Sequence, residues 1–199
     1  MRRAVLKGLA TIGLAATFGF SANAQTEADP ENVLVIEIAG EGAGTVEILM
    51  RPDVAPLHVD RIKELARSGA YDGVVFHRVI EGFMAQTGDV EFGQLEGYDY
   101  RMAGRGGSGL DDVPAEFSNL SYVEGIVGMA RSNSPDSANS QFFIVFGDAS
   151  FLDGQYTVIG RVTSGMEYVH AIKLGDSAAN GPVYADPDYM ASVKVKSDL

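Results

Sequence analysis

The sequence predicts one mainly β domain, a closed antiparallel β-barrel with two helices. Short β-rich segments recur along the chain, and glycine contributes 24 of the 199 residues. Only two segments carry the 3.6-residue period of a helix. A parallel sheet would need helices alternating with its strands, so this pattern favours a closed or sandwiched antiparallel sheet. The length, with 46% hydrophobic residues, suits a single core.

The first 24 residues predict a secretory signal peptide, and we set them apart from the domain. A basic start (residues 2–7) precedes a short apolar run (residues 8–20) and the small-residue pattern Ala22-Asn23-Ala24. We expect cleavage before Gln25. A membrane anchor is the alternative, but the apolar run is short for one. The paired arginines loosely resemble a twin-arginine signal, although ordinary secretion ranks first. The protein is therefore expected to be exported, and periplasmic if its host has an outer membrane.

The charge of the remaining chain is strongly negative. Three of the 15 basic residues and none of the 27 acidic residues lie in residues 1–24, which leaves 12 against 27 and a formal net charge of −15. Such a surface repels phosphate groups, so we expect neither nucleic acid nor an anionic membrane as partner, and no membrane insertion after signal cleavage. The sequence has no cysteine, which excludes disulfides and thiol catalysis.

The first elements after the signal peptide are a flexible lead-in and a β-hairpin. Residues 25–32 are polar and predict the lead-in, and the domain is expected to span residues 33–199. The segments Val33–Ile38 and Thr45–Leu49 are rich in β-branched residues, and the glycine-rich stretch AGEGAG separates them.

A helix is predicted over the segment DVAPLHVDRIKELARSG. Pro56 suits a first helical turn, and Gly69 suits a stop. One face of this helix is apolar, with Val59, Ile62, Leu65 and Ala66 on it. A second helix is predicted in GMEYVHAIKLGD, residues 165–176, where Met166, Val169 and Ile172 follow the helical period.

The remaining strands are short. They are predicted over Val74–Ile80, Ile126–Ala130, Gln141–Phe146, Thr157–Val162 and Val193–Val195. Between the first two of these strands, Val90–Asp112 is long and glycine-rich. A phosphate-binding loop would need a Lys-Ser/Thr pair leading into a helix, and both are missing, so we interpret this segment as a solvent loop.

Several chemistries lack support in the sequence. The three histidines, His58, His77 and His170, lie in separate elements without metal-ligand spacing, so no metal is expected. No Gly-x-Ser-x-Gly motif is present. Acidic pairs such as Asp111-Asp112 are common on a surface of this charge. An enzyme with this sequence is expected to use neither a cofactor nor a covalent intermediate.

One apolar segment, VVFHRVIEGFMAQTGD, carries a charge that requires explanation, since a buried unpaired charge is costly. Strand alternation places His77 and Arg78 on opposite faces, and His77 is interpreted as structural. In SQFFIVFG, the same alternation places Gln141 and Phe143 together. Polar groups beside aromatic rings suit a binding groove, whereas ordinary packing around an arginine that reaches solvent is equally compatible with the pattern.

Two long motifs resemble a known family. YDGVVFHRVIEGFMAQTGD and GIVGMARSNSPDSANSQFFIVFGDASFLDGQYTVIGRV are similar to the two signature regions of the cyclophilin-type peptidyl-prolyl cis-trans isomerases, in a bacterial exported form. The resemblance runs in order from about Val33 to the C-terminus. It implies a closed eight-stranded antiparallel barrel capped by two α-helices, and acceleration of rotation about X-Pro bonds.

The resemblance also implies a set of site residues. Arg78 is expected to be the catalytic donor, with Gln86 orienting it and Gln141 holding the flanking peptide. The substrate-binding positions implied are Phe83, Met84, Met129, Ala130, Arg131, Phe143, Phe151, Leu152 and Tyr156. The expected partners are proline-containing unfolded or partly folded polypeptides, and the protein is expected to be a monomer.

Four positions depart from the family pattern. Glu81 replaces a proline common in the family, and Arg131 replaces the asparagine of eukaryotic members. Phe151 and Tyr156 stand where eukaryotic members have tryptophan and histidine. These two replacements predict weak cyclosporin binding at most. The competing hypotheses are a peptide-binding chaperone or adaptor that uses the same groove, and a barrel without a catalytic role.

Overall fold

The computed structural model describes residues 28–199, so the predicted signal peptide and its cleavage site lie outside the described residues. Within this range, no helix has the length and apolar character needed to cross a membrane. The described part of the chain begins within the predicted lead-in. Pro30–Asn32 forms a 3₁₀ turn, and Glu31 binds Arg67 of the first helix at 2.8 Å.

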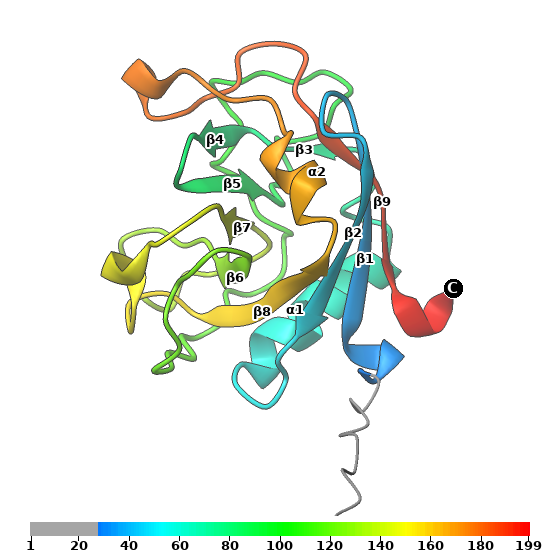
Figure 1. Cartoon of the computed structure of the whole chain (residues 1–199), viewed down its shortest axis with the longest axis vertical. Coiled ribbons are helices and arrows are strands. Elements are labelled where there is room, and N and C mark those ends of the chain that lie inside the picture. Colours follow the sequence, from blue (N-terminus) through cyan, green and yellow to red (C-terminus); the bar gives the residue numbers. More distant parts are fainter. Residues whose placement is uncertain (1–27) are drawn as a thin grey trace, which may run out of the picture.

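Nine strands form one curled antiparallel sheet (Figure 1). Their bounds are β1 Val33–Ala39, β2 Gly44–Met50, β3 Val74–Val75, β4 Arg78–Ile80, β5 Met84–Thr87, β6 Ile126–Met129, β7 Phe142–Val145, β8 Val158–Ser164 and β9 Tyr189–Val195. The strand order is β3-β9-β1-β2-β8-β6-β7-β5-β4. The sheet is a curled half-barrel whose end strands, β3 and β4, are not paired with each other, so the predicted closed eight-stranded barrel is corrected.

Two helices accompany the sheet. The predicted first helix is confirmed as α1, Pro56–Arg67, which packs against β9. Its first turn is capped from another segment, since the Glu116 carboxylate accepts from the backbone N–H groups of Leu57 and His58 at 3.2 and 3.1 Å.

The second helix, α2, spans only Met166–His170, and is shorter than predicted. The backbone N–H of Lys173 donates to the buried Asp188 carboxylate at 2.7 Å instead of continuing a helical ladder. The same carboxylate accepts from the Gly42 N–H at 2.8 Å. The chain just beyond α2 is therefore bound to Asp188 instead of continuing as a helix.

The predicted strand Val74–Ile80 is interrupted in its middle. Phe76 and His77 belong to neither β3 nor β4, and both are buried. The N–H of Phe76 donates to the carbonyl of Asp188 at 2.8 Å. Phe76 packs in the main core. Strict alternation of faces holds only in an uninterrupted strand, so it does not extend from β3 through Phe76 to Arg78.

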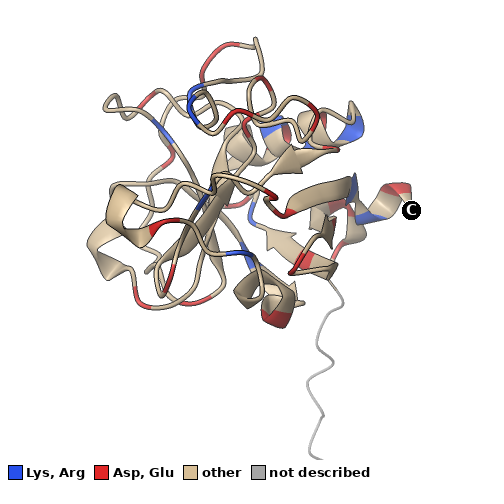
Figure 2. Cartoon of the chain, turned by 90° about the horizontal axis from the view of Figure 1, so that it is seen from above, with Lys and Arg blue, Asp and Glu red and all other residues tan. Residues whose placement is uncertain are grey.

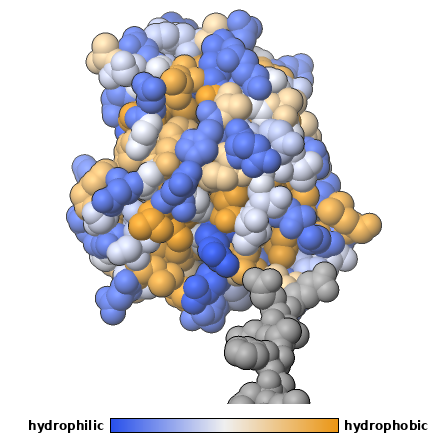
Figure 3. Space-filling view, viewed as in Figure 1, coloured by the Kyte–Doolittle hydropathy of each residue, from blue (hydrophilic) through white to orange (hydrophobic). Residues whose placement is uncertain are grey.

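The hydrophobic interior is divided into a main core and a smaller second cluster. The main core fills the concave side of the sheet beneath α1 and includes Phe76, Met129 and Phe142. The second cluster lies at β5 and β7, and comprises Met84, Tyr122, Phe143, Val145, Ala149, Leu152 and Val158. On the outer face shown in Figure 3, hydrophobic residues form small areas separated by hydrophilic ones.

Candidate active site

Arg78 extends from β4, and its guanidinium is held by neutral acceptors. Nη1 donates to Oε1 of Gln86 at 3.1 Å, and Gln86 faces it across the β4–β5 pair. Nε and Nη2 donate to the carbonyl and side-chain oxygens of Asn180 at 3.0 and 2.9 Å. Burial lowers the pKa of Arg78, although a guanidinium stays protonated around neutral pH. Three of its five N–H groups are thus engaged and two are left.

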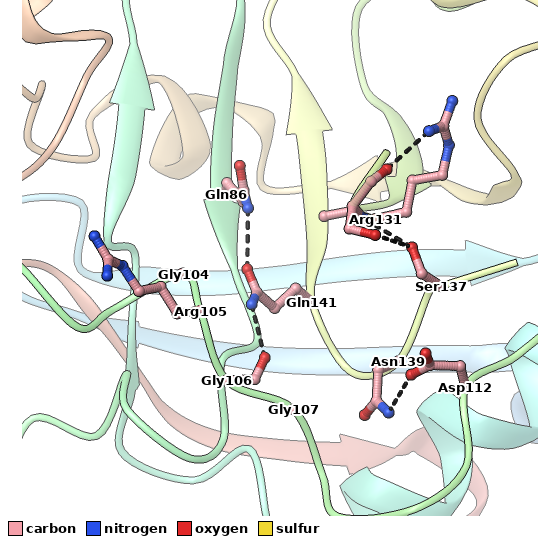
Figure 4. Close-up of a pocket in the computed structure, with 12 residues that line it drawn as sticks. Gln86, Gly104, Arg105, Gly106, Gly107, Asp112, Arg131, Ser137, Asn139 and Gln141 are labelled. Atoms are coloured by element: carbon pink, nitrogen blue, oxygen red, sulfur yellow. Dashed lines mark hydrogen bonds between the residues drawn. The ribbon is translucent and has the colours of Figure 1, made fainter. Parts of the chain in front are cut away.

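A chain of hydrogen bonds continues from Gln86 (Figure 4). Nε2 of Gln86 donates to Oε1 of Gln141 at 3.0 Å, and Nε2 of Gln141 donates to the carbonyl of Gly106 at 2.9 Å. Neither glutamine amide can turn without losing a bond. The chain therefore fixes the side of Gln86 that faces Arg78.

A pocket of about 110 Å³ lies beside Arg78, and we call it the proline pocket because the family resemblance implies that it receives the proline ring. Its lining residues are Arg78, Phe83, Met84, Gln86, Ala130, Arg131, Phe143, Leu152 and Tyr156. The ring of Phe143 is fixed between two others, stacked on Tyr122 at 5.8 Å and edge-on to Tyr156 at 5.9 Å between centroids. This pocket has aromatic walls and two arginines, Arg78 and Arg131, in its lining.

Two of the predicted substrate-binding side chains lie outside the proline pocket. Met129 is 1% exposed in the main core, so its side chain does not line the groove. Phe151 is 63% exposed and packs its ring on Phe83 at 5.4 Å, outside the residues that line the pocket. Arg131 covers the ring of Tyr156 at 4.4 Å and donates from Nη2 to the carbonyl of Gln155 at 2.8 Å.

A second pocket of about 420 Å³ adjoins the first, and we call it the neighbouring pocket. The two pockets share Gln86, Ala130 and Arg131, so together they form one continuous groove. Gln141, the third predicted catalytic residue, lines the neighbouring pocket. Its remaining wall comes from Gly104–Gly107 and from the segment that contains Ser132, Ser137 and Asn139.

The wall at Gly104–Gly107 corrects the interpretation of residues 90–112 as a plain solvent loop. The carboxylate of Asp89 is fully buried and accepts from the N–H groups of Gly104 and Gly106 at 2.7 and 3.0 Å. It also accepts from the N–H groups of Glu91 and Phe92. This carboxylate therefore holds the loop against the groove.

Sequence reasoning missed Asn180 and Asp89. An Asn-Gly pair favours positive φ, and Asn180 and Gly181 have φ of 69° and 85°. That signal predicts a turn, but it does not predict contact with Arg78, which lies 102 positions away. Asp89 is the last residue of the first signature motif. The sequence does not predict its four backbone partners, because they are brought to it only when the loop folds.

Within residues 28–199, none of the three histidines takes part in the hydrogen bonds that hold Arg78, Gln86 and Gln141. His77 is buried beneath Gly104, and burial lowers its pKa to about 4. Neither of its ring nitrogens has a hydrogen-bond partner within residues 28–199. In the same range, no group of three or more His, Asp or Glu side chains could hold a metal ion.

Comparison with protein families shows which family the chain belongs to. Residues 33–195 match the family model for the cyclophilin type peptidyl-prolyl cis-trans isomerases. The chain is 54% identical over 172 residues to a probable peptidyl-prolyl cis-trans isomerase of Brucella suis, covering 86% of each. The chain belongs to the cyclophilin family.

This cyclophilin is also similar to a named isomerase and to solved structures. It is 36% identical over 162 residues to peptidyl-prolyl cis-trans isomerase A of Dickeya dadantii, covering 77% of this chain and 80% of that protein. A crystal structure of a cyclophilin from Hirschia baltica matches with a TM-score of 0.71 and 26% identity, over 86% of this chain and 76% of the other.

A second solved cyclophilin, from Cryptosporidium parvum and crystallised with the dipeptide Ala-Pro, matches with a TM-score of 0.66. It covers 82% of this chain and 98% of the other, and its 23% identity supports the fold alone. Taken with the family match and the named relatives, the chain is a cyclophilin-type peptidyl-prolyl cis-trans isomerase.

Proposed function

We propose that Arg78 accelerates X-Pro rotation by donating a hydrogen bond to the proline nitrogen of the twisted amide. Rotation must overcome a barrier of roughly 18–20 kcal/mol, because it breaks amide resonance. In the twisted state the nitrogen is pyramidal and carries a localised lone pair, whereas the planar amide offers little there to accept. A donor that prefers the twisted state lowers the barrier without making or breaking a covalent bond.

One observation carries this proposal: Arg78 is held on three N–H groups and keeps two others, beside the proline pocket. Phe83, Met84 and Phe143 would hold the pyrrolidine ring in that pocket. Gln141 and the backbone at Ala130 would hold the flanking peptide while the other side rotates. Arg131 is engaged with Gln155 and Tyr156, so its guanidinium would serve as part of the wall.

Two measurements on the wild type and on Arg78→Ala separate catalysis from simple peptide binding. One follows isomerisation of a proline peptide, and the other follows suppression of aggregation of an unfolded protein. We expect the substitution to abolish most of the isomerisation with the fold intact. Retained isomerisation would remove Arg78 from catalysis. If the protein suppresses aggregation without accelerating isomerisation, and Arg78→Ala still suppresses aggregation, the chaperone hypothesis replaces the proposed catalysis.

We also propose that the enzyme is exported and acts on unfolded or partly folded polypeptides. The signal-like pattern of residues 1–24 and the absence of cysteine support export. The open groove, which can admit an extended chain on both sides of a proline, supports such substrates. Intact mass of the protein recovered from its host tests export, since we expect Gln25 as the mature N-terminus and an uncleaved Met1 would contradict it.

A monomer is the proposed assembly. The two edges of the sheet are strands of two and three residues, β3 and β4, which offer little backbone for edge-to-edge pairing with a second copy. The formal charge of −15 after signal removal also opposes self-association, because two copies repel each other. Weak cyclosporin binding remains a prediction from the replacements at Phe151 and Tyr156.

A further inference from the structure

Basic side chains are concentrated around the groove of an otherwise acidic protein. Figure 2 shows acidic residues spread over the loops and strands all around the molecule. Twelve basic residues belong to positions 28–199, since three of the 15 precede them, and 26 acidic ones do, since one of the 27 precedes them. A third pocket, of about 550 Å³, shares Arg78 and Gln86 with the proline pocket.

The three pockets contain four of those basic residues and one acidic residue. They are Arg78, Arg101, Arg105 and Arg131, against Asp112. The amide of Asn139 donates to Asp112 at 2.9 Å. Arg101 is already neutralised by Asp99 at 2.7 Å. Among the residues that line the three pockets, basic side chains therefore outnumber acidic ones.

Of these four arginines, Arg105 has the side chain with the fewest polar contacts to other residues. It is exposed, lines both the neighbouring and the third pocket, and forms no ion pair within residues 28–199. In Figure 4, Arg105 and Arg131 lie on opposite sides of the row formed by Gln86, Gln141 and Gly106. The side chain of Arg105 is thus free to meet a group that enters the groove.

The backbone that carries Arg105 is rigid. The residues on either side of it, Gly104 and Gly106, both donate their N–H groups to one oxygen of the buried Asp89. The carbonyl of Gly106 also accepts from Gln141, which joins this loop to the chain of hydrogen bonds that reaches Arg78. A held backbone reduces the entropy lost when the side chain engages a ligand.

We propose that Arg105 selects proline peptides with a carboxylate side chain, Asp or Glu, a few residues from the proline. This inference rests on the proposed function, because it names the substrates of the same groove. An arginine on a fixed backbone suits bidentate contact with a carboxylate, and Arg78 and Arg131 in the adjoining walls add to the attraction. The acidic surface elsewhere repels such peptides until they reach the groove, so the preference depends on local contact.

The experiment compares matched proline peptides by NMR exchange. Each carries Glu, Gln or Lys at one position among the three on either side of the proline, and kcat/KM is measured with the wild type, Arg105→Gln and Arg161→Gln. Arg161 is exposed on β8 and lines none of the three pockets, so its substitution removes the same charge elsewhere.

We expect the wild type to favour Glu over Gln by about two- to fivefold at one or two positions, the size of an exposed ion pair. Arg105→Gln should bring that ratio close to one, and Arg161→Gln should leave it unchanged. A ratio that Arg105→Gln does not alter overturns the inference. An equal preference at all six positions also overturns it, because that pattern indicates general attraction.

The Gln peptides keep this test separate from the proposed function. If the wild type does not accelerate their isomerisation, or if Arg78→Ala accelerates it equally, the proposed function has failed. If they are accelerated in an Arg78-dependent way while Glu brings no advantage, only the role of Arg105 has failed.

Discussion

Arg78 is a partly buried charge whose partners within the described residues are all neutral. Its three hydrogen bonds go to oxygens of Gln86 and Asn180, and it forms no ion pair with a carboxylate there. An acidic partner would fix the guanidinium equally well, but would neutralise the charge that a localised lone pair is attracted to. Amide and carbonyl acceptors satisfy its donors and leave that charge available.

The positioning role of Gln86 can be tested by Gln86→Leu. This substitution removes the acceptor for Nη1 of Arg78 and the donor to Gln141. We expect kcat/KM for a proline peptide to fall roughly tenfold, about 1.4 kcal/mol of barrier. In the Arg78→Ala background the same substitution should cost almost nothing further. An equal additional loss there would mean that Gln86 acts independently of Arg78.

At the scale of elements, the sequence predicted segments with a strong local pattern and missed those set by distant contacts. The apolar face and terminal signals of Pro56–Arg67 were sufficient to predict α1. The strand from Val74 ends at Val75, and the N–H of Lys173, just beyond the short α2, bonds to Asp188 instead of to a helical carbonyl. No local pattern reports that contact.

The candidate site divides in the same way. The signature motifs identified the wall built from β4, β5 and β7, including Arg78 and Phe143. The sequence did not predict the opposite wall at Gly104–Gly107 or the hydrogen bonds from Arg78 to Asn180. Each depends on a contact between a loop and a residue elsewhere in the chain, Asp89 for the first and Arg78 for the second.

The junction between β8 and α2 gives a prediction about an element. Gly165 has φ +84°, and a Cβ there would meet the carbonyl oxygen of Thr45. Gly97 has φ +78°, and a Cβ there would have no heavy atom within 4 Å. Gly97→Ala therefore isolates the cost of the backbone conformation, about 1–2 kcal/mol. We expect Gly165→Ala to cost about 1–3 kcal/mol more in urea unfolding. Equal losses for the two variants would show that β2 moves aside without penalty.

At the scale of the whole molecule, buried histidines make stability depend on pH. Burial lowers the pKa of His77 to about 4, below the roughly 6.5 of an unfolded chain, and also lowers that of His58. Between these values the unfolded state binds more protons. Stability is therefore complete above about pH 6.5 and falls on acidification, by up to roughly 1.4 kcal/mol per pH unit for His77.

Urea unfolding at several values between about pH 7.5 and 5 measures this dependence. His77→Gln should make the slope of unfolding free energy against pH shallower, whatever its effect at pH 7.5. An unaltered slope in His77→Gln would contradict the neutral, buried state of this ring.

Catalysis should not follow the same pH dependence. The proposed mechanism uses a guanidinium, which does not titrate near neutrality, and uses no general acid or base. We expect kcat/KM for a neutral proline peptide to stay nearly constant from about pH 6 to 9, where the fold is intact. A bell-shaped profile would indicate a titrating catalytic group and contradict the mechanism.

The central claim is that Arg78 stabilises the twisted amide more than the planar one, and separate values of kcat and Kd for Arg78→Ala test it most directly. NMR line shapes of a proline peptide at several concentrations give both values. We expect kcat to fall by about 100-fold, the usual loss for one donor aimed at a transition state, while Kd changes less than about threefold. A weakened Kd with kcat preserved would show that Arg78 only binds the substrate, and would contradict the claim.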